Sequence, residues 1–254
     1  MKRFVIWLFF IAAGVFSSVA AVERAPSPPQ DLATFDSEVI QARRLMRRAC
    51  GIAQELAAAQ APDTAKRAEA IRLINEMRGQ WAAIQAKYAN TPPAAYAGDR
   101  TFPNRLASVD ASMAQMISLL TANQPMAAAK QACGGACGTL VAMHEENGLV
   151  YALDRLFHLR KTAMTTVAAG KIGGPGAIRE LVPELLHQRD RVFLAPCPNP
   201  TDTARCAEYR AALREMSTAI DDLATRTVAG DREGVVETLN GLLARINRAY
   251  GLAM

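Results

Sequence analysis

Long runs of strong helix-forming residues, separated by short breaks that contain proline or glycine, dominate the sequence. The stretch FDSEVIQARRLMRRACGIAQELAAAQ, residues 35–60, is typical and is rich in Ala, Leu, Arg, Glu and Gln, residues of high helix propensity. Alternating runs of Val, Ile and Thr, which would predict strands, are almost absent. Half of the residues are hydrophobic and 21% are charged, a composition that supports a packed core. The sequence therefore predicts an all-α fold.

Residues 1–21 have the parts of a secretory signal peptide. Lys2 and Arg3 are basic, residues 4–16 are apolar, and small residues at 18–21 offer a cleavage site. A membrane anchor is the alternative, but the apolar run is short for a bilayer span. A Pro-rich linker follows at 22–34, and no later segment is apolar enough to cross a bilayer. We therefore expect a protein exported to a bacterial periplasm, without a membrane span after cleavage.

Helix signals divide the rest of the chain into eight segments. We expect helices at about 35–60, 64–88, 105–123, 125–147, 150–169, 177–193, 203–228 and 232–250. Gly148 is expected to end the fourth helix, Asp202 or Thr201 to cap the seventh, and Asp231 to cap the last. The segment GKIGGPG, which precedes the sixth helix, reads as a connection between helices.

The two halves of the mature chain resemble each other weakly, at an offset of 103 residues. The matching pairs are Met113 with Met216, Leu120 with Leu223, Leu140 with Leu243, and Gly148 with Gly251. Each half has four predicted helices, and each can bury its apolar stripes only against its own neighbours. We expect two tandem antiparallel four-helix bundles, at residues 35–148 and 149–254. A single eight-helix domain is the alternative.

The charge of the chain does not point to nucleic acid. The formal net charge is +5, and it falls to +3 without Lys2 and Arg3, which is too small and too scattered for such a partner. Arg43, Arg44, Arg47 and Arg48 cluster in the first helix. We expect them to form a solvated helix face, with a patch that binds an anion or a partner as the alternative.

The stretch ACGGACGTLVAMHEENG, residues 132–148, carries two cysteines and a histidine on one predicted helix. Steps of four, three and four residues place Cys133, Cys137, Leu140 and His144 on one helix face, which we expect to be turned to the bundle interior. At a rise of about 1.5 Å per residue, His144 is roughly 16 Å from Cys133 and about 10 Å from Cys137. Neither cysteine can share one small ion with His144, so the sequence predicts two separate candidate sites.

The stretch LLTANQPMAAAKQACGGACGTLVAMHEENG, residues 119–148, and the first predicted helix resemble the four-helix-bundle cytochromes of the cytochrome c′ and b-type family. In that family a histidine near the end of the fourth helix binds the haem iron. In the b-type members a methionine of the first helix is the opposite ligand. The resemblance implies His144 and Met46 as axial ligands, and electron transfer or small-ligand binding as the function, with a periplasmic redox partner.

The chain departs from that family at the cysteines that would bond the haem covalently. Leu140 and Met143 stand in their place, so haem would be held without thioether bonds, which a Met–His pair allows. In the second half Asn247 stands in the place of the histidine ligand. The resemblance therefore implies one haem site, in the first half.

Five cysteines remain in the mature chain, and export favours disulfides. Cys197 and Cys206 flank the short loop PNPTDTAR, and we expect them to be bridged. For the other three, two interpretations stay open. Cys50 could be bridged to Cys133 or Cys137. Alternatively, Cys50, Cys133 and Cys137 could bind Cu(I) or another soft metal, as thiolates do, with a metal-trafficking partner.

No motif points to an enzyme. His158 and His187 have no adjacent nucleophile, and the HEENG stretch contains a single histidine, unlike the two of the zinc-protease motif. The sequence therefore favours a binding protein. A scaffold without haem, stapled by disulfides and carrying a partner surface, is the further alternative.

Overall fold

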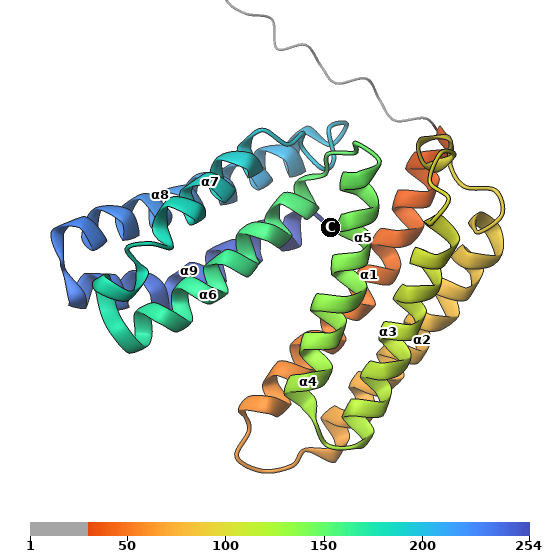
Figure 1. The fold of residues 1–254 in the computed structure, drawn as a ribbon, viewed down its shortest axis with the longest axis horizontal. Helices are drawn as coiled ribbons and strands as arrows, with labels where there is room; N and C mark the ends of the chain where they lie inside the picture. The colour runs from red at the N-terminus through yellow and green to blue at the C-terminus, as the bar shows by residue number, and fades with distance from the viewer. Residues whose placement is uncertain (1–29) are drawn as a thin grey trace, which may run out of the picture.

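The structure, a computed structural model, describes residues 30–254, without the side chains of Gln30, Ala132 and Cys133. The predicted signal peptide and residues 22–29 of the predicted linker lie outside the described residues. Helices joined by short connections make up residues 30–254, which contain no strand (Figure 1). The prediction of an all-α fold is confirmed. Within the same residues no helix combines the length and the apolar character of a membrane span.

The N-terminal helices share one hydrophobic core. They are α1 (Gln30–Ala58), α2 (Thr64–Tyr88), the short 3-10 helix η1 (Ala94–Tyr96), α3 (Phe102–Thr121), and a broken helix made of α4 (Pro125–Lys130), the π-helical segment η2 (Gln131–Ala136) and α5 (Cys137–Glu146). Helix α1 packs against α2 and α4, and α3 packs against α2 and the broken helix. Phe35, Trp81, Tyr96 and Phe102 are fully buried in this core. We call these helices the first helix set.

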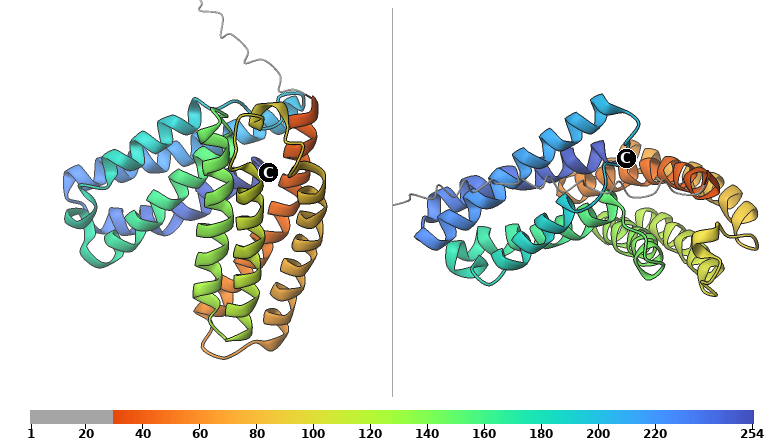
Figure 2. Two further views of the ribbon diagram at one scale, coloured as in Figure 1. Left: turned by 45° about the vertical axis from the view of Figure 1, so that its right-hand side comes forward. Right: turned by 90° about the horizontal axis from the view of Figure 1, so that it is seen from above.

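The remaining helices share a second core. They are α6 (Ala152–Ile178), α7 (Val182–Phe193), α8 (Thr203–Ala229) and α9 (Arg232–Leu252), and we call them the second helix set. Helix α9 packs against α6 and α8, and α7 packs against α6 and α8. Leu159, Leu185, Met216 and Leu242 are fully buried here. The two sets diverge from one junction near the C-terminus (Figures 1 and 2).

Local capping signals set most helix ends. The carboxylates of Asp63, Asp202 and Asp231 accept hydrogen bonds from backbone amides in the first turns of α2, α8 and α9, as N-cap residues do. Gly148 and Gly230 adopt a φ of +72° just after α5 and α8, a conformation that glycine favours at the end of a helix. The predicted caps at Asp202, Asp231 and Gly148 are confirmed.

Helix α1 begins earlier than expected, and α6 is kinked where a break was predicted. Helix α1 begins at Gln30, so residues 30–34, predicted as linker, are helical, and Leu32 is buried. The predicted break at GKIGGPG is confirmed, because α6 consists of two helical pieces that meet at a kink in this segment. The backbone leaves helical geometry at Gly174, where φ is +65° and ψ is −152°, and Pro175 follows. Glycine tolerates the positive φ, and a proline at the start of the next turn needs no hydrogen-bonded amide.

The fourth predicted helix is interrupted by a π-helical segment. Residues 131–136 form η2, between α4 and α5. A Cβ atom on Gly135 would lie 2.7 Å from the hydroxyl oxygen of Ser112 on α3, so the glycine permits a close helix contact. A π turn contains more residues than an α turn. The α-helical spacing that placed residues 133 and 137 on one face therefore does not apply across this segment.

Two of the predicted repeat pairs are buried at both positions, but the glycine pair differs in structure. Met113 and Met216 are buried in their separate cores, and so are Leu120 and Leu223. Gly148 ends its helix with a positive φ, whereas α9 continues beyond the matching residue, Gly251, to Leu252. The last helix, expected at about 232–250, therefore ends two residues later than predicted.

Cys197 and Cys206 lie at disulfide distance, as the sequence predicts. Their Cα atoms are 5.9 Å apart, within the usual range for a bridge. The pair closes the connection between α7 and α8.

Candidate functional site

A cluster of buried polar side chains occupies the junction between the two helix sets. Arg43, His144 and Asp154 form its centre, with exposed fractions of 3%, 4% and 1%. Tyr250 joins them from α9, where its hydroxyl is 3.3 Å from a guanidinium nitrogen of Arg43. Burial of ionisable groups is costly unless they are paired, so the cluster is the strongest candidate for a site with a specific role. We call these four residues the junction cluster.

Only one ring nitrogen of His144 has a hydrogen-bond partner among the described residues. Its Nδ1 atom lies 2.6 Å from Oδ2 of Asp154, which is in the first turn of α6. Since a carboxylate only accepts hydrogen bonds, Nδ1 carries the hydrogen of this contact. The other ring nitrogen, Nε2, is buried and has no hydrogen-bond partner among the described residues. A neutral His144 therefore presents an unengaged lone pair inside the protein.

Asp154 is shared between His144 and Arg43. Its second oxygen, Oδ1, is 3.6 Å from Nη1 of Arg43, an ion pair that is longer than a hydrogen bond. Asp154 also lies at the N-terminal end of α6, where the helix dipole favours negative charge. The carboxylate is thus stabilised by a cation, a helix end and the imidazole of His144.

The arginines of α1 bind the C-terminal end of α9. Arg44 donates to the carbonyl oxygen of Met254, and Arg47 donates to that of Asn247 at 3.1 Å. The guanidinium of Arg47 also lies 5.7 Å from the ring centre of Tyr250. The prediction of a solvated face is wrong for Arg43, which is buried. The reason is that the hydroxyl of Tyr250 on α9 and the carboxylate of Asp154 on α6, both distant in sequence, pack against its guanidinium.

Burial and pairing shift the pKa values of several groups in and around the junction cluster. Burial raises the pKa of Asp36 above its usual value, although the hydroxyl of Tyr151, which donates to it at 2.6 Å, works in the opposite direction. Burial also raises the pKa of Tyr250 to about 12. Burial alone would lower the pKa of Arg43, but Tyr250, Cys137 and Asp154 raise it above its usual value. Arg43 is therefore a permanent buried cation.

The other predicted site residues of the first helix set are buried as well. Met46 and Cys50 follow Arg43 along α1, and Cys137 begins α5. Among the described side chains, no group of three or more His, Cys, Asp or Glu residues is arranged to hold a metal ion. The side chain of Cys133 is not among the described ones, so the pairing of Cys50, Cys133 and Cys137 stays a prediction.

Sequence reasoning missed Asp154, which the structure joins to His144. One signal was present, because Asp154 is an acidic residue in the apolar stretch YALDRLF. An acidic residue in the first turn of a helix is ordinarily explained by the helix dipole. Its contact with Arg43 depends on tertiary structure and has no local signature.

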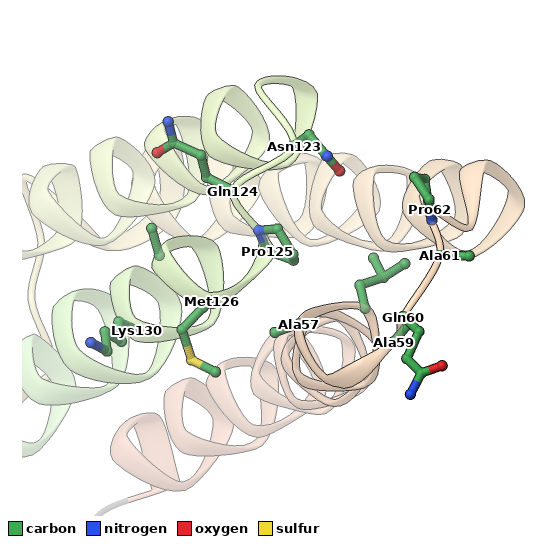
Figure 3. Close-up of a pocket in the computed structure, with 12 residues that line it drawn as sticks. Ala57, Ala59, Gln60, Ala61, Pro62, Asn123, Gln124, Pro125, Met126 and Lys130 are labelled. Carbon is green, nitrogen blue, oxygen red and sulfur yellow. The ribbon is translucent and has the colours of Figure 1, made fainter.

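Two surface pockets lie away from the junction cluster. The larger, of about 650 Å³, is between the connections α1–α2 and α3–α4, and it is lined by residues such as Ala57, Pro62, Met126 and Lys130 (Figure 3). The smaller, of about 430 Å³, is lined by residues of α7 and α8 and by Leu194, which follows α7. None of the residues of the junction cluster lines either pocket.

No family model, curated protein or solved structure matches this chain.

Proposed function

We propose that this chain is an exported binding protein in which Nε2 of His144 binds the iron of a haem held without covalent bonds. The observation that carries the proposal is the state of His144, whose Nδ1 contacts a carboxylate while its Nε2 is buried and unpartnered. Histidines that bind metals almost always donate their other N–H to a carboxylate, a carbonyl or a water. Asp154 supplies the carboxylate of that arrangement.

Both proposed ligands, His144 and Met46, are buried. Met46, which would be the second residue to hold the group, lies one turn after Arg43 on α1, so it is on the side of α1 that carries the contact to Asp154. Fully buried Tyr96 has its ring centre 6.5 Å from that of His144. When bound, the haem would supply an iron for electron transfer or for small-ligand binding. The protein would supply the imidazole, a thioether and a core that excludes water.

We propose further that the chain consists of two tandem antiparallel four-helix bundles, as in the resemblance to cytochrome c′ and b-type proteins. Separate cores for the two helix sets support this arrangement. So do the contacts between consecutive helices within each set. In the first bundle, α4, η2 and α5 together would make the fourth helix. Export to a periplasm and a redox partner there belong to the same proposal.

The first test is an absorption titration of the purified protein with haemin. We expect the wild-type protein to develop a Soret band that sharpens on reduction with dithionite. We expect the band to be lost in His144→Ala, because the iron loses its ligand. His187→Ala, which changes an exposed histidine on α7, is the matched control and should titrate as the wild type does. Circular dichroism confirms that the variants are folded.

Two outcomes of this titration would contradict the proposal. A wild-type protein that gives no Soret band with equimolar haemin does not bind haem. A His144→Ala protein that keeps the band unchanged binds haem elsewhere.

A second candidate function is Cu(I) binding by Cys50, Cys133 and Cys137. The burial of Cys50 and Cys137 favours it, as does the packing of α1 against η2, the segment that contains residue 133. We expect the reduced protein to retain one Cu(I) per chain against a competing chelator and to lose it in Cys50→Ser. The double variant C197S/C206S is the control and should retain the metal. Equal retention in both variants, or none in the wild type, would exclude this site.

A further inference from the structure

We propose that Asp154 is a positioning residue for His144, so that the second helix set completes a binding site carried by the first. This inference rests on the proposed function, because it concerns the same imidazole. It gives the second helix set a role that its own sequence does not indicate, since Asn247 stands in the place of a ligand there.

The contact between His144 and Asp154 is short and enclosed. The two side chains belong to α5 and α6 and are separated by ten residues along the chain. The distance of 2.6 Å between Nδ1 and Oδ2 is slightly shorter than the roughly 2.7–2.9 Å of charge-assisted N–H···O hydrogen bonds. With Nδ1 holding the hydrogen, the neutral imidazole is fixed in the tautomer whose Nε2 can bind a metal.

Aromatic side chains restrict the ring of His144. The ring centre of Tyr151 lies 4.6 Å from that of His144. Tyr151 is itself fixed, because its hydroxyl donates to Asp36 on α1 at 2.6 Å. Rotation of the imidazole would therefore break the contact with Asp154 and disturb the packing of Tyr151. The orientation of Nε2 follows from these contacts.

Asp154 is in turn fixed by both helix sets. Arg43 of α1 pairs with it and donates to Tyr250 of α9. The junction cluster thus connects α5, α6, α1 and α9 through consecutive polar contacts. A ligand that binds only when His144 is oriented will stabilise the docking of the two sets, and the docking will strengthen binding by the same factor, because such coupling is reciprocal.

The test compares Asp154→Asn with Glu146→Gln. Both changes neutralise a carboxylate near His144, but Glu146 is exposed on α5 and pairs with Arg105. In the apo protein, nitrogen NMR of His144 should report a hydrogen on Nδ1 in the wild type and in Glu146→Gln. We expect Asp154→Asn to lose that single tautomer. Haemin should bind Asp154→Asn about 10- to 100-fold more weakly than wild type, and Glu146→Gln within a few-fold of it.

The double variant Arg43→Met/Asp154→Leu covers the case in which Asp154→Asn does not fold. It removes both buried charges, which proteins often tolerate, and it should show the same loss of tautomer. An unchanged His144 tautomer in the folded variants would overturn the inference. A wild-type protein that binds no haemin, but whose tautomer depends on Asp154, would overturn the proposed function and leave the positioning role standing.

Discussion

Replacement of Arg43 by methionine is expected to lower the free energy of unfolding by about 3–5 kcal/mol. Methionine keeps much of the length of the side chain but removes the charge that faces Asp154. Asp154 is 1% exposed, so water cannot replace the lost cation. The loss of one partner from a buried ion pair is costly for this reason. Urea denaturation at neutral pH, followed by circular dichroism, measures the effect.

Arg48→Met is the matched control for this prediction. Arg48 is on the same helix but exposed, and it pairs with Glu69 at 3.8 Å. Exposed ion pairs contribute about 0–1 kcal/mol, so this variant should unfold close to the wild type. Equal losses in the two variants would mean that the buried pair does not stabilise the junction.

Replacement of Trp81 by alanine is expected to cost about 3–5 kcal/mol of unfolding free energy. Trp81 is fully buried in the core of the first helix set, and its indole N–H donates to the carbonyl oxygen of Leu106 at 2.8 Å. Truncation leaves a cavity between α2 and α3 and removes this hydrogen bond. The measurement is the same denaturation, followed by circular dichroism because the variant loses an indole fluorophore.

Two further variants are the controls for the loss of unfolding free energy in Trp81→Ala. Trp81→Phe keeps most of the buried ring and should lose clearly less than the alanine variant. Ile172→Ala truncates a side chain that is 85% exposed and should change the free energy by less than about 0.5 kcal/mol. A Trp81→Ala protein as stable as Ile172→Ala would show that the core around α2 is not closely packed.

The helix pattern and its caps could be predicted because their causes are local. Helix α2 has the predicted bounds, Thr64–Tyr88, and the capping carboxylates of Asp202 and Asp231 act within their own first turns. A side chain that bonds an amide three residues away can be recognised from the sequence alone. The end of α5 at Gly148 was predictable for the same reason.

The parts that were not predicted depend on neighbours distant in sequence. The pattern of its own helix predicts that Arg43 is solvated. Only the packing of α9 and α6 buries it. The π-helical segment at residues 131–136 contains Gly135, which lies close to Ser112 on α3, and no helical periodicity reveals that neighbour. His144 was found as a candidate, but its partner Asp154 was not, because their contact requires two helices to meet.

The junction cluster also constrains the order in which the chain can fold. Tyr250 follows Arg43 by 207 residues, so a growing chain contains Arg43 long before the hydroxyl that will accept its hydrogen bond. The first helix set can bury its apolar residues early, yet the α1 surface around Arg43 stays incomplete until α9 has been made. The docking of α9 on α1 can therefore come only after the rest of the chain has been made, and a chain stopped before α9 would keep Arg43 paired with Asp154 but without the hydroxyl of Tyr250.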